Sequence, residues 1–217
     1  MINKVNKLIY SSAISEIKLD IYSKKNINRN VLVISINREN KLNAISDKIL
    51  SELINIFNLY SNENSVGSVI ITGSGQKSFI AGADIELMST FNSEEAHQYS
   101  IKGQSLIKII SNYSKPVLGC VNGYALGGGC EIALACHLRY ASSNAIFGQP
   151  EVKLGIIAGW GGTQNLPRLI GPSNALDLLL SGRNIKSDEA YRLGLVNNIF
   201  EQDLLDEVIK IAFKINQ

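Results

Sequence analysis

Cysteine is scarce in this sequence and is not arranged for cross-linking or metal binding. Three cysteines occur among 217 residues, Cys120, Cys130 and Cys136, and all lie in apolar stretches without a C-x-x-C pair. An odd number of cysteines in such surroundings argues against a disulfide framework and against a zinc site. We therefore expect three reduced thiols packed in the hydrophobic core.

Neither sign of charge predominates, and long hydrophobic runs are missing. The chain has 21 Lys and Arg against 19 Asp and Glu, with no basic block. Since nucleic acids and anionic membrane surfaces attract clustered positive charge, we expect neither as a partner. No run approaches the roughly 18 apolar residues of a membrane span, and the N-terminus lacks a signal-peptide core. We expect a cytoplasmic protein with a small-molecule or protein partner.

What the sequence contains is a regular alternation of strand and helix patterns. At 45% hydrophobic residues the chain can bury one substantial core. Short β-branched runs that end in turn residues alternate with amphipathic stretches, which predicts an α/β fold with mainly parallel strands. The expected strands are residues 31–37, 68–73 and 116–123, and the expected helices are residues 46–60 and 93–112. The first of these helices begins with Ser46 as a suitable N-cap, and the second with Ser93 as its N-cap, followed by first-turn acids.

We expect three regions along the chain. Residues 1–30 are predicted to be a frayed leader with a loosely attached first strand, and residues 31–200 the core. Residues 201–217 form a C-terminal helical segment, in which 204–215 carry one broad apolar face. That face needs a partner, either within the chain or on another subunit.

Three consecutive glycines introduce a candidate site. Gly127, Gly128 and Gly129 follow "NGYAL" and precede an apolar helical run that contains a single carboxylate, Glu131. Backbone without side chains can approach a ligand closely, and the N-terminus of the helix directs free N–H groups at the same place. The alternative interpretation is a tight strand-to-helix turn followed by an ordinary first-turn acid.

A second carboxylate and a second glycine turn have similar surroundings. Glu151 follows a proline in "FGQPE" and precedes the glycine-rich "GWGG", whereas "KSFIAGADI" (77–85) has a glycine turn before a predicted helix. Two glutamates in apolar, glycine-rich sequence can face one cavity, where perturbed pKa values suit acid and base catalysis. Neither G-x-S-x-G nor G-x-G-x-x-G occurs, which disfavours a serine hydrolase and a dinucleotide enzyme.

Taken together, "AGADI", "NGYALGGGCE" and "FGQPEVKLGI" with "GWGGTQ" resemble the crotonase family, the enoyl-CoA hydratases and isomerases. The resemblance runs in order from about residue 30 to residue 200, and bacterial short-chain hydratases are closest in pattern. It implies a ClpP/crotonase-like α/β superhelix of strand-strand-helix (ββα) turns with a short helical C-terminal segment. It also implies a homotrimer or hexamer.

The resemblance assigns roles to four positions. The backbone N–H groups of Ala83 and Gly128 form an oxyanion hole for the thioester carbonyl of the substrate. Glu131 deprotonates the attacking water, and Glu151 exchanges the proton at the α-carbon. The implied reaction is reversible syn addition of water to a 2-enoyl-CoA, without a metal or redox cofactor, because coenzyme A is part of the substrate. An isomerase or lyase of the family and a noncatalytic acyl-CoA-binding subunit stay open as alternatives.

Substrate contacts are implied at a further set of positions: Ala81, Gly82, Asp84, Ile85, Gly127, Gly159, Trp160 and Lys41. The phosphate contacts are where this sequence departs from the family, with Glu39 in place of a common proline and Glu86 in place of a frequent lysine. Lys41 and Arg38 are therefore either phosphate ligands or solvated surface charges. Trp160 either lines the acyl pocket or simply packs. Family members usually continue into helices that cover the acyl site, so we expect that cover to be missing or supplied by another subunit.

Overall fold

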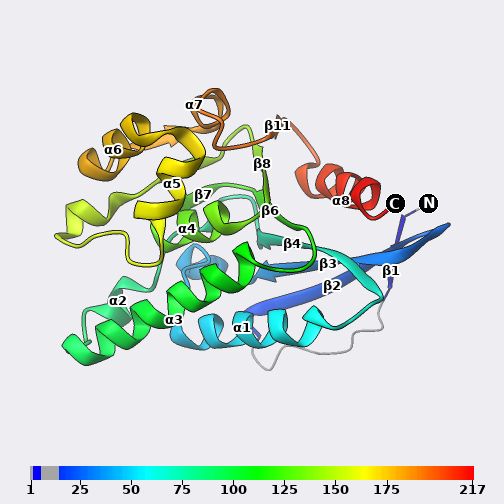
Figure 1. Ribbon diagram of the computed structural model, residues 1–217, viewed down its shortest axis with the longest axis horizontal. Helices are drawn as coiled ribbons and strands as arrows, with labels where there is room; N and C mark the ends of the chain where they lie inside the picture. The colour runs from blue at the N-terminus through cyan, green and yellow to red at the C-terminus, as the bar shows by residue number, and fades with distance from the viewer. Residues whose placement is uncertain (1, 6–14) are drawn as a thin grey trace.

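Two β-sheets form the framework of the molecule (Figure 1). The computed structural model describes residues 2–5 and 15–217. The larger sheet has the order β1 (Ile2–Val5), β2 (Ile17–Lys24), β3 (Ile27–Ile36), β4 (Val66–Gly73), β6 (Val117–Val121), β8 (Leu138–Ser142), β11 (Asn198–Phe200). The smaller sheet has the order β10 (Asn184–Lys186), β9 (Ile146–Gly148), β7 (Tyr124–Leu126), β5 (Ser78–Ile80). The pairs β1–β2, β2–β3 and β10–β9 are antiparallel and all others are parallel, which confirms the predicted mainly parallel pairing.

The helices connect these strands and cover both faces of the larger sheet. They are α1 (Asp47–Ser61), α2 (Ile85–Met88), α3 (Ser93–Ser111), α4 (Gly128–Ala135), α5 (Gly162–Ile170), α6 (Pro172–Ser181), α7 (Ser187–Arg192) and α8 (Leu204–Ile215). Two short 3₁₀ helices, η1 (Glu39–Lys41) and η2 (Pro150–Leu154), lie in connections. In Figure 1, α1 and α3 lie on one side of the larger sheet and α8 on the other. Coverage of both faces explains why every residue of β4 is buried.

A repeated unit runs through the middle of the chain. In β4–β5–α3, β6–β7–α4 and β8–β9–α5, the first strand joins the larger sheet, the second joins the smaller sheet, and a helix follows. This confirms the predicted ββα turns. Because β5, β7 and β9 are neighbours in the smaller sheet, the loops at the ends of these strands meet in one place. The glycine motifs of the sequence lie in those loops.

The apolar face of the C-terminal helix finds its partner within the chain. Val208, Ala212 and Phe213 of α8 are buried in a core cluster with Val31 and Ile70 of the larger sheet. Of the two alternatives for this face, packing inside the same chain is therefore the one observed. The helix closes the face of the sheet that α1 and α3 leave open.

The N-terminal part of the described chain is more tightly attached than the sequence suggested. Instead of one loosely attached strand, β2 pairs with β3 along most of its length, and its alternate residues Ile17, Leu19 and Ile21 are buried. This alternation of buried and exposed residues is what holds a strand against a core. Of the predicted leader and first strand at residues 1–30, residues 1 and 6–14 lie outside the described residues.

The N-caps of the two long helices lie at or next to the predicted residues. The Ser46 side chain accepts a hydrogen bond from the Ile49 N–H (3.3 Å), as predicted for the start of α1. The cap of α3 is Asn92 and not Ser93, because Asn92 and Glu95 form a reciprocal capping box.

The three cysteines are free and buried, and burial raises the pKa of each thiol to about 12. Among the described residues, no helix has the length and apolarity needed to cross a membrane.

Candidate active site

A cavity of about 530 Å³ lies where the ends of β5 and β7 meet α3, α4 and η2. All but two of the twelve predicted site residues line it: Ala81, Gly82, Ala83, Ile85, Gly127, Gly128, Glu131, Glu151, Gly159 and Trp160. These residues come from three separate ββα units. The structure therefore brings together motifs that are distant in the sequence.

Each glycine of the triplet meets a different structural requirement. Gly127 has φ +50°, a conformation that L side chains rarely adopt. A Cβ at Gly128 would lie 2.7 Å from Cζ3 of Trp160, and a Cβ at Gly129 would overlap the carbonyl oxygen of Ile80. The triplet is thus a tight turn, and it also allows close packing of α4 against β5 and against the indole.

Glu131 lies on the first turn of α4 and is 2% exposed. Its Oε1 accepts hydrogen bonds from the backbone N–H groups of Trp160 (2.8 Å) and Gly162 (2.7 Å). Burial raises the pKa of Glu131 to about 7; the Gly162 and Trp160 bonds oppose the rise, and the charge of Glu151 adds to it. A carboxylate with this pKa exchanges protons readily near neutral pH.

Glu151 lies on η2, directly after Pro150, and lines the same cavity. Burial also raises the pKa of this carboxyl group. With its amide nitrogen turned toward Glu151, Gln149 donates to both carboxylate oxygens at 3.2 Å. Oε1 of Glu151 would lie only 3.0 Å from a Cβ at Gly127, so this carboxylate lies close to the glycine turn. A buried carboxyl group on α4 and a half-buried one on η2 thus border one apolar cavity.

Two backbone N–H groups in the cavity wall are left for a ligand. Ile45 pairs with both neighbours of Ala83: its N–H donates to Gly82 O (2.9 Å), and its carbonyl accepts from Asp84 N (3.0 Å). The N–H of Ala83 therefore points away from Ile45, and that of Gly128 opens α4. Within residues 2–5 and 15–217, neither N–H donates to a protein acceptor. Unpaired N–H groups at a helix start and a turn favour an oxygen atom that carries negative charge.

An aromatic wall closes one side of the cavity, and the sequence did not predict all of it. Trp160 stacks edge to face on Tyr99 (ring centroids 5.5 Å apart), and Tyr99 does so on Phe91 (5.3 Å). The Tyr99 hydroxyl donates to Ile45 O (3.0 Å). Trp160 is 5% exposed, so it both lines the cavity and packs in the core. Tyr99 and Phe91 belong to no local motif, and neither was predicted as a site residue.

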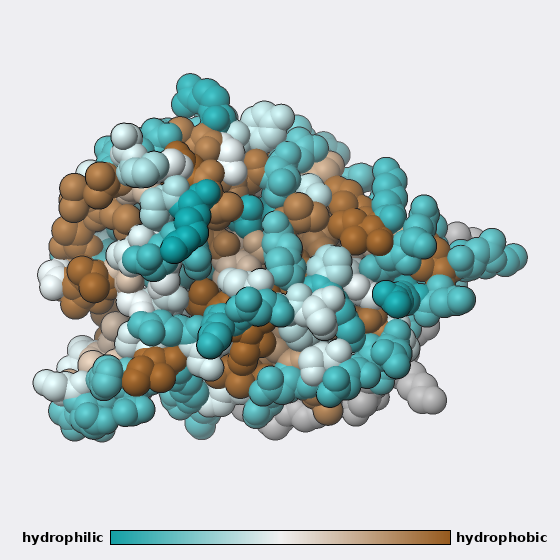
Figure 2. All heavy atoms as spheres, viewed as in Figure 1, coloured by the Kyte–Doolittle hydropathy of each residue, from teal (hydrophilic) through white to brown (hydrophobic). Residues whose placement is uncertain are grey.

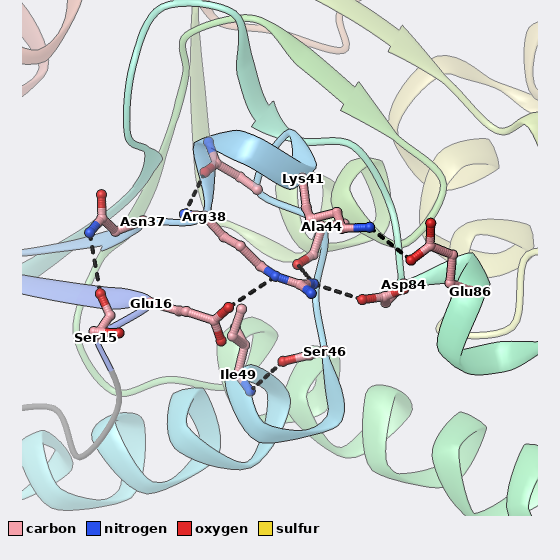
Figure 3. Close-up of polar contacts among 11 residues, drawn as sticks. Ser15, Glu16, Asn37, Arg38, Lys41, Ala44, Ser46, Ile49, Asp84 and Glu86 are labelled. Atoms are coloured by element: carbon pink, nitrogen blue, oxygen red, sulfur yellow. Dashed lines mark hydrogen bonds and ion pairs between the residues drawn. The ribbon is translucent and has the colours of Figure 1, made fainter.

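Asp84 and Lys41 are the two predicted site residues that do not line the cavity. Figure 3 shows that Asp84 accepts from Nη1 of Arg38 (2.8 Å) and that Lys41 pairs with Glu86 (2.7 Å). Arg38 also pairs through Nε with Glu16 (3.0 Å), and its side chain is 16% exposed. Arg38 is therefore held in a polar network and is not a solvated surface charge. Contact of Lys41 or Asp84 with a substrate stays a prediction.

Comparison with known proteins gives consistent results. The family described as enoyl-CoA hydratase/isomerase matches residues 26–217. A crotonyl-CoA hydratase of Syntrophomonas wolfei is 48% identical over 184 residues, 84% of this chain and 71% of the relative. A short-chain-enoyl-CoA hydratase of Clostridium acetobutylicum is also 48% identical, covering 85% of this chain and 71% of the relative. The crystal structure of an enoyl-CoA hydratase from Bacillus anthracis superimposes with TM-score 0.86 at 38% identity, covering 93% of this chain and 76% of that one.

Proposed function

The chain belongs to the enoyl-CoA hydratase/isomerase family, and we propose that it adds water reversibly to a short-chain 2-enoyl-CoA thioester. The observation that carries this proposal is that two carboxyl groups, those of the buried Glu131 and the half-buried Glu151, line one apolar cavity. Relatives at 48% identity are named as crotonyl-CoA and short-chain enoyl-CoA hydratases, which supports a short acyl chain. The expected compartment is the cytoplasm.

The proposed oxyanion hole consists of the N–H groups of Ala83 and Gly128. Addition of a nucleophile to the β-carbon of an enoyl thioester moves negative charge onto the carbonyl oxygen. Both N–H groups line the cavity and lack protein acceptors among the described residues, so they are available to that oxygen. One such donor typically stabilises the transition state by about 3 kcal/mol. Substrate contacts by the backbone of Ala81, Gly82, Ile85 and Gly127 complete this part of the proposal.

In the proposed mechanism Glu131 acts as the base. Its Oε1 is held by two backbone N–H groups, which leaves Oε2 to accept the proton of a water molecule. As the water oxygen bonds to the β-carbon, its proton passes to Glu131, and Glu151 delivers a proton to the α-carbon. The reverse transfers dehydrate the product. When both carboxyl groups face the same side of the double bond, the addition is syn. This chemistry uses no metal or redox cofactor, and coenzyme A enters as part of the substrate.

We also propose that the protein forms a homotrimer or hexamer. Figure 2 shows apolar side chains gathered at the left of the view, over η2 and α6. Large apolar residues there are exposed, including Leu154 (55%), Ile157 (79%) and Leu180 (71%). A contiguous exposed apolar patch is typical of a surface that another subunit covers. Sedimentation analysis tests this proposal, and a monomer at micromolar concentration would contradict it.

The decisive experiment follows the loss of the ultraviolet absorbance of crotonyl-CoA, the conjugated thioester. We expect rapid loss with the native protein and a decrease of about a hundredfold or more for Glu131→Gln and for Glu151→Gln, because each removes a proton-transfer group. The matched control is Glu201→Gln, which changes an exposed glutamate that does not line the cavity.

Other outcomes would identify the alternatives. Conversion of a 3-enoyl to a 2-enoyl thioester, without hydration, would indicate an isomerase. Binding of crotonyl-CoA without any turnover would indicate an acyl-CoA-binding subunit. Full activity of either glutamine variant would overturn the proposed roles.

A further inference from the structure

We propose that Arg38 is a positioning residue that orients the oxyanion-binding N–H of Ala83 through Asp84. The inference rests on the proposed function, because it assigns to Ala83 the stabilisation of the enolate oxygen. Arg38 itself does not line the cavity. Its effect on the reaction is therefore indirect and runs through the backbone that it holds.

The guanidinium group of Arg38 bonds to three segments of the chain (Figure 3). Nη1 donates to Asp84 Oδ2 (2.8 Å) and to the carbonyl oxygen of Ala44 (3.3 Å), and Nε pairs with Glu16 (3.0 Å). The side chains of Arg38 and Asp84 are only 16% and 13% exposed. Charge-assisted bonds in such a shielded place are short and directional, so they restrain geometry more than a solvated ion pair does.

Asp84 transmits this restraint to the peptide unit of interest. It follows Ala83 directly, its Oδ1 accepts from Leu87 N (3.3 Å), and its own N–H donates to Ile45 O (3.0 Å). On the other side of Ala83, the carbonyl of Gly82 accepts from Ile45 N (2.9 Å). The carbonyl of Gly82 and the N–H of Ala83 belong to one planar peptide unit, so the bond from Ile45 N sets the direction of that N–H, and the bonds of Asp84 hold the next peptide unit in place.

The peptide unit needs such support because Gly82 provides none of its own. Gly82 has φ +97°, and glycine is free to adopt many other conformations. Arg38 bonds to Ala44, which precedes Ile45, and to Asp84, which follows Ala83, so it holds both segments of the Ile45–Ala83 bridge. Without them, the turn can rotate and direct the N–H away from the cavity.

The hydrogen bonds and ion pair of Arg38 also argue against a role of this residue in phosphate binding. Nη1 and Nε of Arg38 are engaged with Asp84, Ala44 and Glu16. A phosphate ligand would affect substrate binding, and only for substrates that carry phosphates. A positioning residue would affect transition-state stabilisation for every thioester.

The test compares Arg38→Met with Arg29→Met, a matched variant of an exposed arginine at the other end of β3. Kinetics are measured with crotonyl-CoA and with crotonyl-pantetheine, which lacks the nucleotide phosphates. We expect Arg38→Met to lower kcat about tenfold with both thioesters and to leave KM nearly unchanged, because misdirecting one donor costs part of its effect. Arg38→Lys keeps a cation and should lose less, and it provides the same comparison if Arg38→Met does not fold.

Two further measurements identify the route of the effect. In an Asp84→Asn background, Arg38→Met should add little, because both changes weaken the same contact. The infrared stretch of the thioester carbonyl in bound butyryl-CoA, which is not hydrated, should fall in frequency on binding to the native protein. The fall should be smaller for Arg38→Met, because an aligned N–H donor weakens the C=O bond.

Distinct outcomes would overturn the inference. An increase in KM confined to crotonyl-CoA would make Arg38 a phosphate ligand. An unchanged kcat and an unchanged carbonyl frequency would show that Asp84 and Ala83 do not depend on it. Absence of hydration by the native protein would instead overturn the proposed function, and that result is seen before any variant is compared.

Discussion

The indole of Trp160 lies directly against Gly103 of α3, so closely that a Cβ at position 103 would overlap its five-membered ring. The six-membered ring of the same indole lies against Gly128 of α4. Trp160 thus fills the space between two glycines on different helices, while its backbone N–H holds Glu131. The position of Glu131 therefore depends on Gly103, a residue that has no catalytic group of its own.

Gly103→Ala should displace the indole and destabilise the protein. In an unhindered helix alanine would add about 1 kcal/mol of stability relative to glycine, whereas overpacking this site should cost about 1–3 kcal/mol. Trp160 is the only tryptophan in the sequence, so its fluorescence reports the displacement directly. We expect a shift of emission to longer wavelength and a lower Tm. Ser105→Ala, on the exposed side of the same helix, is the control, and identical spectra for both variants would refute the expectation.

Within the glycine triplet, Gly129→Ala should be more harmful than Gly128→Ala. The Cβ of Ala at position 129 would meet the backbone carbonyl of Ile80, which cannot move without breaking β5. At position 128 the obstacle is the ring of Trp160, a side chain that can shift. We expect Gly128→Ala to fold with altered tryptophan fluorescence, and Gly129→Ala to yield little folded protein. Circular dichroism and yield of the two variants provide the comparison, and equal behaviour would contradict it.

The raised pKa of Glu131 should make stability fall as pH rises. Its pKa is about 7 in the folded protein and 4.5 ordinarily, so between these pH values the folded state binds more protons than the unfolded state. The stability contributed by the protonated group is complete below about pH 4.5 and is lost as pH rises through about 7. The difference in pKa corresponds to about 3 kcal/mol.

Glu131→Gln should therefore flatten this pH dependence and make the protein more stable than the native form above about pH 7. Urea unfolding at about pH 5 and about pH 8 measures the effect, with Glu201→Gln as the control. Parallel stability curves for the native protein and Glu131→Gln would show that the carboxyl group does not titrate in this range.

Lys41 provides a test that is complementary to that of Arg38. Its ion pair with Glu86 is solvent-accessible, with 43% and 81% of the side chains exposed, so Lys41→Met should leave Tm almost unchanged. If Lys41 contacts the phosphates of coenzyme A, the same variant raises KM for crotonyl-CoA severalfold and leaves crotonyl-pantetheine unaffected. Equal KM values for the two proteins would remove Lys41 from the predicted site.

Much of the local structure could be predicted because its causes lie within a few residues. Ser46 caps α1, the β-branched run of β4 forms a buried strand, and the glycines before Glu131 form a strand-to-helix turn. The error at Asn92 has the same local origin, since Asn and Ser are both good caps and only the bond to Glu95 separates them. Sequence patterns thus predicted the helices that border the cavity, whereas the short elements β5, β7 and η2 were not predicted.

The amino-acid sequence by itself determined the chemical groups of this protein and its local pattern: two glutamates in apolar surroundings, the glycine turns and the alternation of strands and helices. Only the tertiary structure decided that Glu131 and Glu151 border one cavity, that Tyr99 belongs to its wall, and that Arg38 bonds to Asp84. Residues far apart in the chain meet through sheet register and packing, and these depend on the whole core. Local preferences act over a few residues and contain no information about such distances.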